Sequence, residues 1–148
     1  MDPQIRQLHF IKADPLPNRY ARGWHCLGLV SDYTDQPQSL NYFGGKQVAY
    51  RGADDKVHIL DAYCPHMGAD LSGGCVEGNA IRCPFHFWLW GPDGVCRDIP
   101  YTERIPQKAV IKQWHTMEEN KLLFVWNDEE GRLPIEEQRM PRIDDVFS

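Results

Sequence analysis

The sequence predicts an all-β fold built from small antiparallel sheets, and three observations lead to this class. Short runs rich in β-forming residues recur after Trp24, with turn-forming residues between them. The chain of 148 residues contains 12 glycines and 11 prolines, which interrupt it throughout. No segment has the apolar spacing of an amphipathic helix longer than about ten residues.

The elements can be placed in chain order. Residues 1–23 contain three prolines and no helical period, so we expect an extended N-terminal lead-in. Residues 24–127 are then expected to form a single domain, because that length suffices for one hydrophobic core. Its early strands are predicted at His25–Val30, Gln47–Tyr50 and Val57–Ala62, with a shorter one at Ile81.

The clearest hairpin is predicted near the end of this domain. One strand is expected at Val110–Thr116 and the other at Lys121–Trp126, joined by a turn at Met117–Asn120. Alternation of apolar and polar residues places five side chains on its inner face, namely Val110, Trp114, Leu122, Phe124 and Trp126.

The remaining residues, 128–148, are acidic and polar and contain two prolines. We expect them to be a tail, or a linker toward a catalytic domain that these residues do not include. The whole chain has a formal charge of −5 and a pI near 5.6, so it lacks the basic excess that attracts nucleic acid or anionic lipid. A protein partner is expected instead.

The apolar runs indicate no membrane protein. They are far shorter than the roughly 20 residues that a membrane-spanning helix needs. The N-terminal residues MDPQIRQLHF also lack the basic and apolar regions of a secretory signal, so we expect a cytoplasmic protein. Cysteines in that compartment are ligands, reactive thiols or buried thiols more often than disulfides.

The residues that carry chemistry lie in two short motifs. Cys64-Pro65-His66 is followed, after sixteen residues, by Cys83-Pro84-Phe85-His86. Each motif offers one thiolate and one imidazole. If the two loops lie side by side, both sulfurs can bind one iron and both imidazoles the other, which is the ligand set of a Rieske [2Fe–2S] centre. The cluster-binding part is expected at about residues 62–100.

Formal charge explains why such a centre mixes its ligands. Two ferric ions, two sulfides, two thiolates and two neutral imidazoles sum to zero, whereas a four-cysteine cluster carries −2 and accepts an electron less readily. Zinc is the nearest rival for the four residues. Zinc modules usually pair like ligands within each arm, but here each arm mixes them.

Wider stretches of the chain resemble a known family. CPH and CPFH, with Trp90, Gly94 and Pro100 behind them, resemble the Rieske domain of aromatic-ring and steroid oxygenases. Four segments are similar to the oxygenase component of 3-ketosteroid 9α-hydroxylase: RGWHCLGLVSDY at 22–33, YCPHMGADLSGG at 63–74, CPFHFWLWGPDGVC at 83–96 and LLFVW at 122–126.

The resemblance implies a function in electron transfer. The cluster would take single electrons from a flavin and iron–sulfur reductase and pass them to a mononuclear iron in an oxygenase domain that hydroxylates a ketosteroid. Family oxygenases often form homotrimers, which is the assembly expected of a full-length protein. The alternative that stays open is a stand-alone Rieske ferredoxin serving a separate oxygenase.

The mononuclear iron site itself is not expected in this chain. Beyond the two motif histidines, the sequence offers four others, and none is spaced i, i+4 from another as a helical two-histidine iron site would need; they are His9, His25, His58 and His115. We therefore predict that this chain, alone, lacks hydroxylase activity.

Other residues near the motifs have simpler interpretations. Cys26, Cys75 and Cys96 are expected to be buried free thiols. Met67, next to a candidate ligand, is expected to be a packing cap rather than a metal ligand. The backbone amides of the small residues Gly68, Ala69, Gly73 and Gly74 are expected to donate hydrogen bonds to the cluster.

Overall fold

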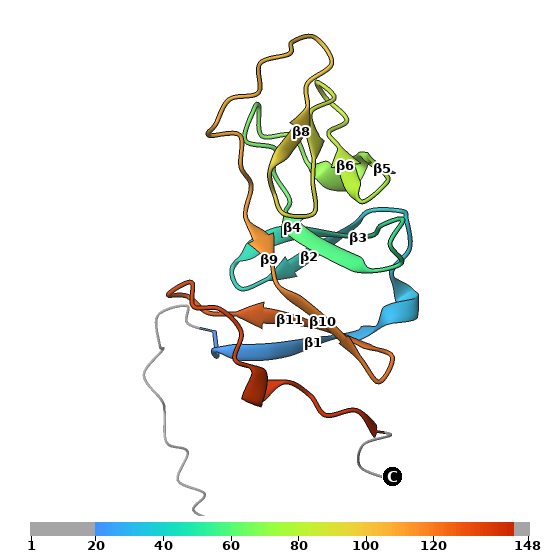
Figure 1. Ribbon diagram of the computed structural model, residues 1–148, viewed down its shortest axis with the longest axis vertical. Coiled ribbons are helices and arrows are strands. Elements are labelled where there is room, and N and C mark those ends of the chain that lie inside the picture. The colour runs from blue at the N-terminus through green and yellow to red at the C-terminus, as the bar shows by residue number, and fades with distance from the viewer. Residues whose placement is uncertain (1–19, 144–148) are drawn as a thin grey trace, which may run out of the picture.

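The computed structural model describes residues 20–143, and the all-β prediction is confirmed. Three antiparallel sheets follow one another along the long axis of the molecule (Figure 1). The helical pieces η2 (Val30–Asp32), η3 (Leu71–Gly73) and η4 (Glu136–Gln138) are single 3-10 turns. Residues 1–19 of the expected lead-in and residues 144–148 of the expected tail lie outside the described part.

Each sheet has a simple strand order. The first is β1-β11-β10, formed by Gly23–Leu29, Leu122–Asn127 and Thr116–Glu119. The second is β2-β3-β4-β9, formed by Gln38–Tyr42, Gly45–Arg51, Val57–Asp61 and Gln113–Trp114. The third is β5-β6-β7-β8, formed by Cys75–Glu77, Ala80–Arg82, Leu89–Trp90 and Cys96–Asp98.

The predicted early strands correspond to β1, β3, β4 and β6. The structure ends β1 at Leu29, because Val30 begins the η2 turn. β2, β5, β7 and β8 had no counterpart in the prediction. β5, β7 and β8 have two or three residues, too few for a pattern of alternation to stand out, and β2 has polar residues at three of its five positions.

The predicted hairpin is partly wrong. Its first strand is divided, because β9 pairs with β4 in the second sheet whereas β10 pairs with β11 in the first. The turn lies at Asn120 and Lys121, whose φ angles of 54° and 66° are typical of a two-residue hairpin turn.

The buried face of β11 also differs from the prediction, because Leu123 and Val125 pack against the second sheet. Leu123 and Val125 are buried, whereas Leu122 and Phe124 are only half-buried. Val110 is 51% exposed, so its expected place on the inner face was wrong. Trp114 and Trp126 are buried as predicted.

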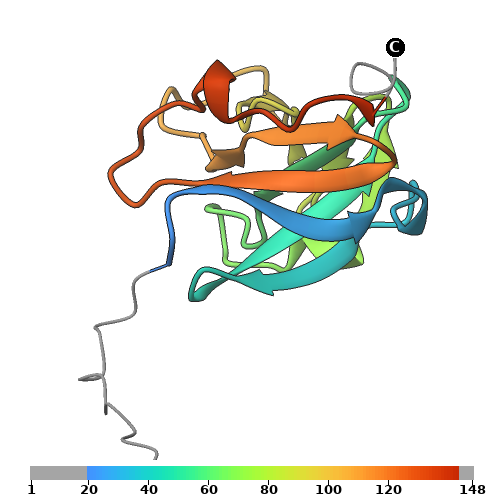
Figure 2. The same cartoon turned by 90° about the horizontal axis from the view of Figure 1, so that it is seen from below.

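Two hydrophobic cores separate the three sheets. One lies between the first two sheets and includes Ile59, Trp114 and Leu123; Figure 2 shows strands of the first sheet lying over those of the second. The other lies between the second and third sheets, around Leu60 and Trp90. This second core ends directly beneath the two motif loops.

The segment after β11 packs against the domain. The Trp126 indole donates to the carbonyl of Arg132 at 2.8 Å, and Glu119 forms ion pairs with Arg139 and Arg142. The described part of the expected tail is therefore fixed along the first sheet. No helix among residues 20–143 is long and apolar enough to cross a membrane.

Candidate metal centre

The two motifs form loops of the same backbone design. In the first loop, residues 64–69, the Cys64 amide donates to the carbonyl of residue 69 at 2.8 Å, and the Gly68 amide donates to the Cys64 carbonyl at 2.7 Å. In the second loop, residues 83–88, the Cys83 amide donates to the carbonyl of residue 88 at 2.8 Å, and the Phe87 amide donates to the Cys83 carbonyl at 3.2 Å. Each loop thus turns back on its own cysteine.

Both motif cysteines lie at the buried base of these loops. Cys64 and Cys83 are 1% and 2% exposed and belong to the same core. Burial is the largest cause that raises the pKa of the Cys64 thiol, and the neighbouring Cys83 raises it further. Hydrogen bonding from the His66 backbone amide opposes that rise in pKa. The two thiols therefore share one dry, enclosed position.

Both motif histidines are only partly buried, in contrast to the cysteines. The rings of His66 and His86 meet edge to face, with their centroids 4.8 Å apart. Trp88 stacks on His66 at 4.3 Å with an interplanar angle of 12°, and its indole donates to the Tyr101 hydroxyl at 2.6 Å. Trp90 is fully buried beneath the loops, so the two tryptophans help to exclude water from the site.

The side chains present fit a bound metal cluster. His86 Nδ1 is buried and has no hydrogen-bond partner among the described residues. A buried ring nitrogen without a partner is costly, and coordination to a metal ion would satisfy it. The structure thus brings all four motif residues together as two thiols below and two imidazoles above. Within residues 20–143, no three potential ligands converge as they would around a single metal ion.

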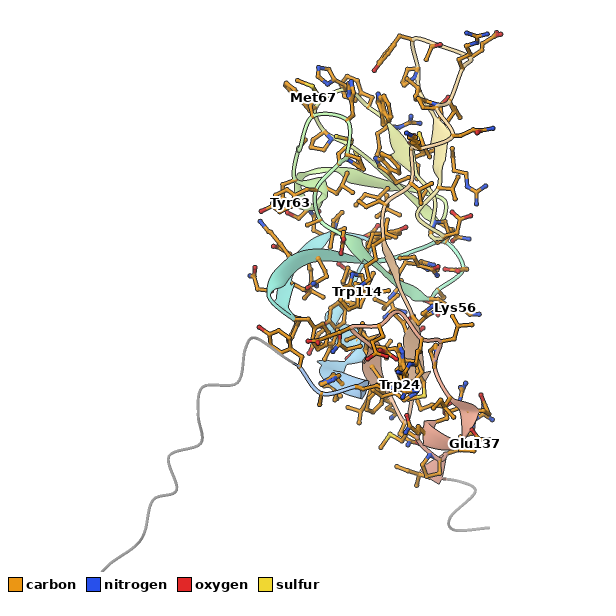
Figure 3. All side chains as sticks on the ribbon, turned by 90° about the vertical axis from the view of Figure 1, so that its left-hand side faces the viewer. Trp24, Lys56, Tyr63, Met67, Trp114 and Glu137 are labelled. Carbon is orange, nitrogen blue, oxygen red and sulfur yellow. The ribbon has the colours of Figure 1, made fainter. Side chains whose placement is uncertain are left out.

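The tip around the histidines is apolar and exposed. Met67, Phe85 and Phe87 have exposed fractions of 63%, 56% and 56%. Met67 therefore does not act as a packing cap, because it follows His66 on the outer side of the loop. Figure 3 shows Met67 at one end of the molecule and Glu137 near the other.

The expected amide donors were wrong for three of the four small residues. The amides of Gly68, Gly73 and Gly74 donate to the carbonyls of Cys64, Asp70 and Leu71. These amides close the loop and the η3 turn. The role of the Gly74 hydrogen atom is steric, because a Cβ there would lie 2.0 Å from the carbonyl oxygen of Arg82.

The remaining cysteines are free, and only one of them is buried. Cys96 is 3% exposed, as expected, whereas Cys26 and Cys75 are exposed. Both exposed cysteines lie in strands that have one face open to solvent. Their exposure could not be predicted without knowing how the strands pair.

Sequence reasoning missed the polar contacts that support the first loop. Asp70 Oδ1 accepts hydrogen bonds from the Ser72 amide at 2.9 Å and the Ser72 hydroxyl at 2.7 Å, which caps η3. Lys46 of β3 reaches the other oxygen of Asp70 at 2.5 Å. The spacing Asp-x-Ser was a local signal for the cap, but nothing local indicated Lys46.

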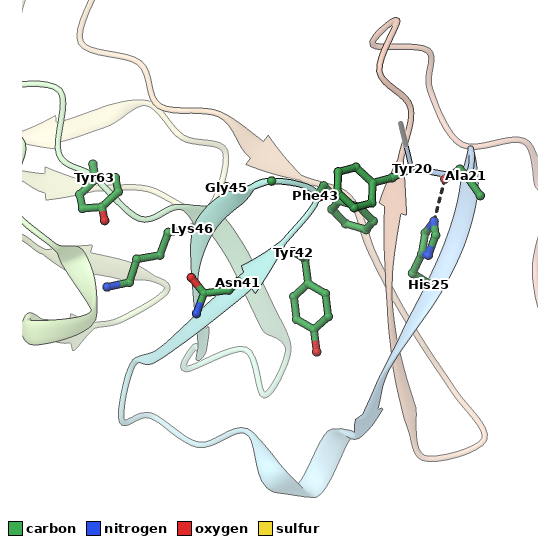
Figure 4. A pocket seen from close by; sticks show the side chains of 10 residues that line it. Tyr20, Ala21, His25, Asn41, Tyr42, Phe43, Gly45, Lys46 and Tyr63 are labelled. Carbon is green, nitrogen blue, oxygen red and sulfur yellow. Dashed lines mark hydrogen bonds between the residues drawn. The ribbon is translucent and has the colours of Figure 1, made fainter. Parts of the chain in front are cut away.

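A surface pocket lies apart from the metal centre, beside the second sheet (Figure 4). Tyr20 packs edge-on against Phe43 at 5.6 Å, and His25 Nε2 hydrogen-bonds a backbone carbonyl at 2.8 Å. Lys46 and Tyr63 line its other side. None of the four motif residues lines this pocket.

Comparison with known proteins supports the same assignment. Residues 23–115 match the family described as Rieske [2Fe-2S] domain. The oxygenase component of 3-ketosteroid-9-alpha-monooxygenase from Rhodococcus rhodochrous is 49% identical over 138 residues, covering 93% of this chain and 35% of that protein. The corresponding Mycobacterium tuberculosis protein is 46% identical over 139 residues, covering 93% and 36%.

A more distant relative and a solved structure extend the comparison. Cholesterol 7-desaturase of Hemicentrotus pulcherrimus is 40% identical over 129 residues, covering 83% of this chain and 28% of that protein. The crystal structure of dicamba monooxygenase bound to dicamba has the same fold, with a TM-score of 0.73, 22% identity and coverage of 86% and 38%. The chain spans about a third of the length of the curated relatives it matches.

Proposed function

The chain belongs to the Rieske [2Fe-2S] domain family, and on that premise we propose that Cys64 and Cys83 hold one iron while His66 and His86 hold the other. The cofactor is a Rieske-type [2Fe–2S] cluster, and the function of the domain is electron transfer. When bound, the cluster accepts and releases one electron at a time.

The observation that carries the ligand proposal is the division of the site into a buried and a more exposed half. Cys64 and Cys83 occupy the enclosed base, where water cannot reach a thiolate. The imidazoles lie toward the apolar tip, and His86 Nδ1 has no other partner among the described residues. Electrons should therefore leave through the histidine side, where a partner can approach most closely.

Metal and sulfide analysis tests the ligand set. We expect two irons and two acid-labile sulfides per chain, with an electron paramagnetic resonance signal of lower average g than a four-cysteine ferredoxin gives. His86→Ala should lose the cluster and destabilise the fold, because the two loops lose their shared anchor. Stoichiometric zinc without sulfide in the wild-type chain would contradict the proposal.

The parent activity is proposed to be hydroxylation of a steroid. The names of the relatives refer to a 3-ketosteroid and to cholesterol, and the two monooxygenase relatives are oxygenase components. We therefore assign a flavin and iron–sulfur reductase as the electron donor and a mononuclear iron domain as the acceptor. The proposed compartment is the cytoplasm.

The arrangement of the chain supports electron transfer between subunits. The cluster loops lie at one end of the molecule, whereas the described chain ends at Ile143, near the opposite end (Figure 1). A catalytic domain that followed in a longer protein would begin far from the tip. A closed ring of subunits, such as a homotrimer, would bring the tip of one copy to the iron of another.

A further inference from the structure

One charged side chain outside the proposed ligand set reaches across the second loop. Arg82 ends β6 and directly precedes Cys83, and its side chain is 19% exposed. Its Nη1 donates to the carbonyl oxygen of Phe87 at 2.9 Å, so it joins the start of the loop to its far end.

Two carboxylates fix the direction of this guanidinium group. Glu77 of β5 accepts from Arg82 Nε at 2.5 Å, and Asp98 of β8 accepts from Nη1 at 2.7 Å. Arg82 is therefore held by carboxylates from the two edge strands of the third sheet. A planar guanidinium has enough donors to satisfy all three acceptors at once, which an ammonium on a flexible stem matches poorly.

The carbonyl that Arg82 binds belongs to a strained residue. Phe87 has a φ of 64°, in the left-handed region, where a Cβ lies too close to the following carbonyl oxygen. Its side chain is 56% exposed, so burial does not hold the backbone there. The hydrogen bond that its backbone amide donates to the Cys83 carbonyl is 3.2 Å long. Strain of this kind persists only where the surroundings impose it.

The first loop provides an internal comparison. Its equivalent position is Gly68, with a φ of 74°, and glycine adopts that conformation without strain. The residue before Cys64 is Tyr63, whose side chain is 51% exposed and makes no hydrogen bond across the loop to any described residue. The loop that has glycine therefore has no such clamp, and the loop that has phenylalanine does.

We propose that Arg82 is a positioning residue that holds the strained Phe87 backbone and thereby sets the geometry in which Cys83 and His86 bind the cluster. This inference rests on the ligand set proposed above. His86 directly precedes Phe87 in the sequence. A looser Phe87 backbone therefore changes the orientation of the His86 imidazole.

A double-mutant cycle tests the proposal on the cluster-loaded chain. The variants are Arg82→Gln, Phe87→Gly and both together, and the measurement is the rate at which iron is lost to a chelator. We expect Arg82→Gln to lose iron roughly tenfold faster than wild type, from the strain that is no longer opposed. In the Phe87→Gly background the same substitution should have little effect, because glycine needs no clamp.

The matched control is Arg97→Gln, which breaks an exposed ion pair with Asp93 in the same sheet. It should leave both the rate of iron loss and the electron paramagnetic resonance spectrum unchanged, whereas Arg82→Gln should shift or broaden the g values through the altered His86. If Arg82→Gln does not fold, Arg82→Lys replaces it in the same cycle, with a smaller expected effect.

The outcomes separate this proposal from the proposed function. Equal effects of the Arg82 substitution in the wild-type and Phe87→Gly backgrounds, or no effect in either, would overturn the positioning role while the wild-type cluster remained intact. A wild-type chain without iron and sulfide would instead overturn the proposed function.

Discussion

Trp88 and Tyr101 support His66, the histidine of the first loop, on one face of its ring. Trp88 lies flat on His66, and the Tyr101 hydroxyl accepts a hydrogen bond from its indole. Tyr101 is itself 63% exposed, so it is the hydrogen bond, rather than burial, that ties this side chain to Trp88.

Removing that hydroxyl should have a small, measurable effect on stability. Tyr101→Phe is expected to lower the free energy of unfolding by about 1 kcal/mol, because the indole loses its acceptor. Urea denaturation of the cluster-loaded chain measures the change. Tyr42→Phe, at another exposed tyrosine, serves as the control and should be neutral. Equal effects of the two substitutions would show that the Trp88 contact does not matter.

The carboxylate of Asp70 makes the stability of the first loop depend on pH. Burial raises the pKa of Asp70, but hydrogen bonds from Lys46 and Ser72 outweigh that effect, so the pKa lies below its ordinary value. Because the pKa is lower in the folded state, the stabilisation is complete above the unfolded-state pKa of about 3.9 and is lost as pH falls through the folded-state value.

Asp70→Asn should remove this pH dependence and preserve the cap, since an amide oxygen can still accept from Ser72. We expect the difference in urea midpoint between wild type and variant to be largest near neutral pH and to shrink as the pH falls below about 4. Asp93→Asn, in the exposed pair with Arg97, is the control. A difference that stays constant with pH would argue against the role of the charge.

At the scale of elements, the third sheet brings its strands close enough to exclude a side chain. Gly74 begins the turn into β5, and a Cβ there would lie 2.0 Å from the Arg82 carbonyl oxygen. Its neighbour Gly73 has open space by comparison, with its nearest contact 3.7 Å away at Pro84. A side chain therefore fits at Gly73 but not at Gly74.

Gly74→Ala should cost about 1–3 kcal/mol of stability, because β5 must move away from β6 to admit the methyl group. Gly73→Ala is the matched control and should be neutral or stabilising by up to about 1 kcal/mol. Thermal and urea unfolding measure both. If the two alanine variants are equally stable, the close approach of the strands is not limiting.

At the scale of the whole molecule, the C-terminal segment 128–143 is attached to the end opposite the cluster. Glu119 pairs with Arg139 and Arg142, and the pKa of its carboxyl is lowered mainly by the hydrogen bond from Arg139. Asn120 adds two bonds, to the Pro141 carbonyl and from the amide of residue 143. These contacts set the direction in which the chain leaves the domain.

Glu119→Gln should release this segment. We expect trypsin to cleave faster after Arg139 and Arg142 in the variant, because local opening exposes both sites. Cleavage after Arg104, in an exposed loop away from Glu119, is an internal control and should keep its rate. Mass spectrometry of timed digests follows all three sites. Unchanged cleavage at the two C-terminal sites would show that the ion pairs do not hold the segment.

This chain should accept electrons but should not hydroxylate a steroid. Given a competent reductase and NADH, the 148 residues are expected to be reduced but to form no hydroxylated steroid, because electron delivery without a mononuclear iron does not activate dioxygen productively. Absorption spectra follow the reduction, and product analysis follows the steroid. Regiospecific product from this chain alone would reveal a second metal site.

The all-β class, the family and the four candidate ligands could all be predicted from the amino-acid sequence. These features depend on residue type and short spacing, such as a cysteine two or three positions before a histidine in each motif. A strand such as Val57–Asp61 was also predictable, because its alternating pattern is local.

The pairing of the strands, and the side chains that meet across them, could be known only from the folded protein. The division of Gln113–Trp114 from Thr116–Glu119 depends on β4 and β11, partners far away in the sequence. The contact of Arg82 with residues 77, 87 and 98 likewise needs the third sheet to be assembled. The free energies of burial and strand pairing come from neighbours that are distant in the sequence, whereas the ability to bind a metal belongs to each side chain wherever the chain places it.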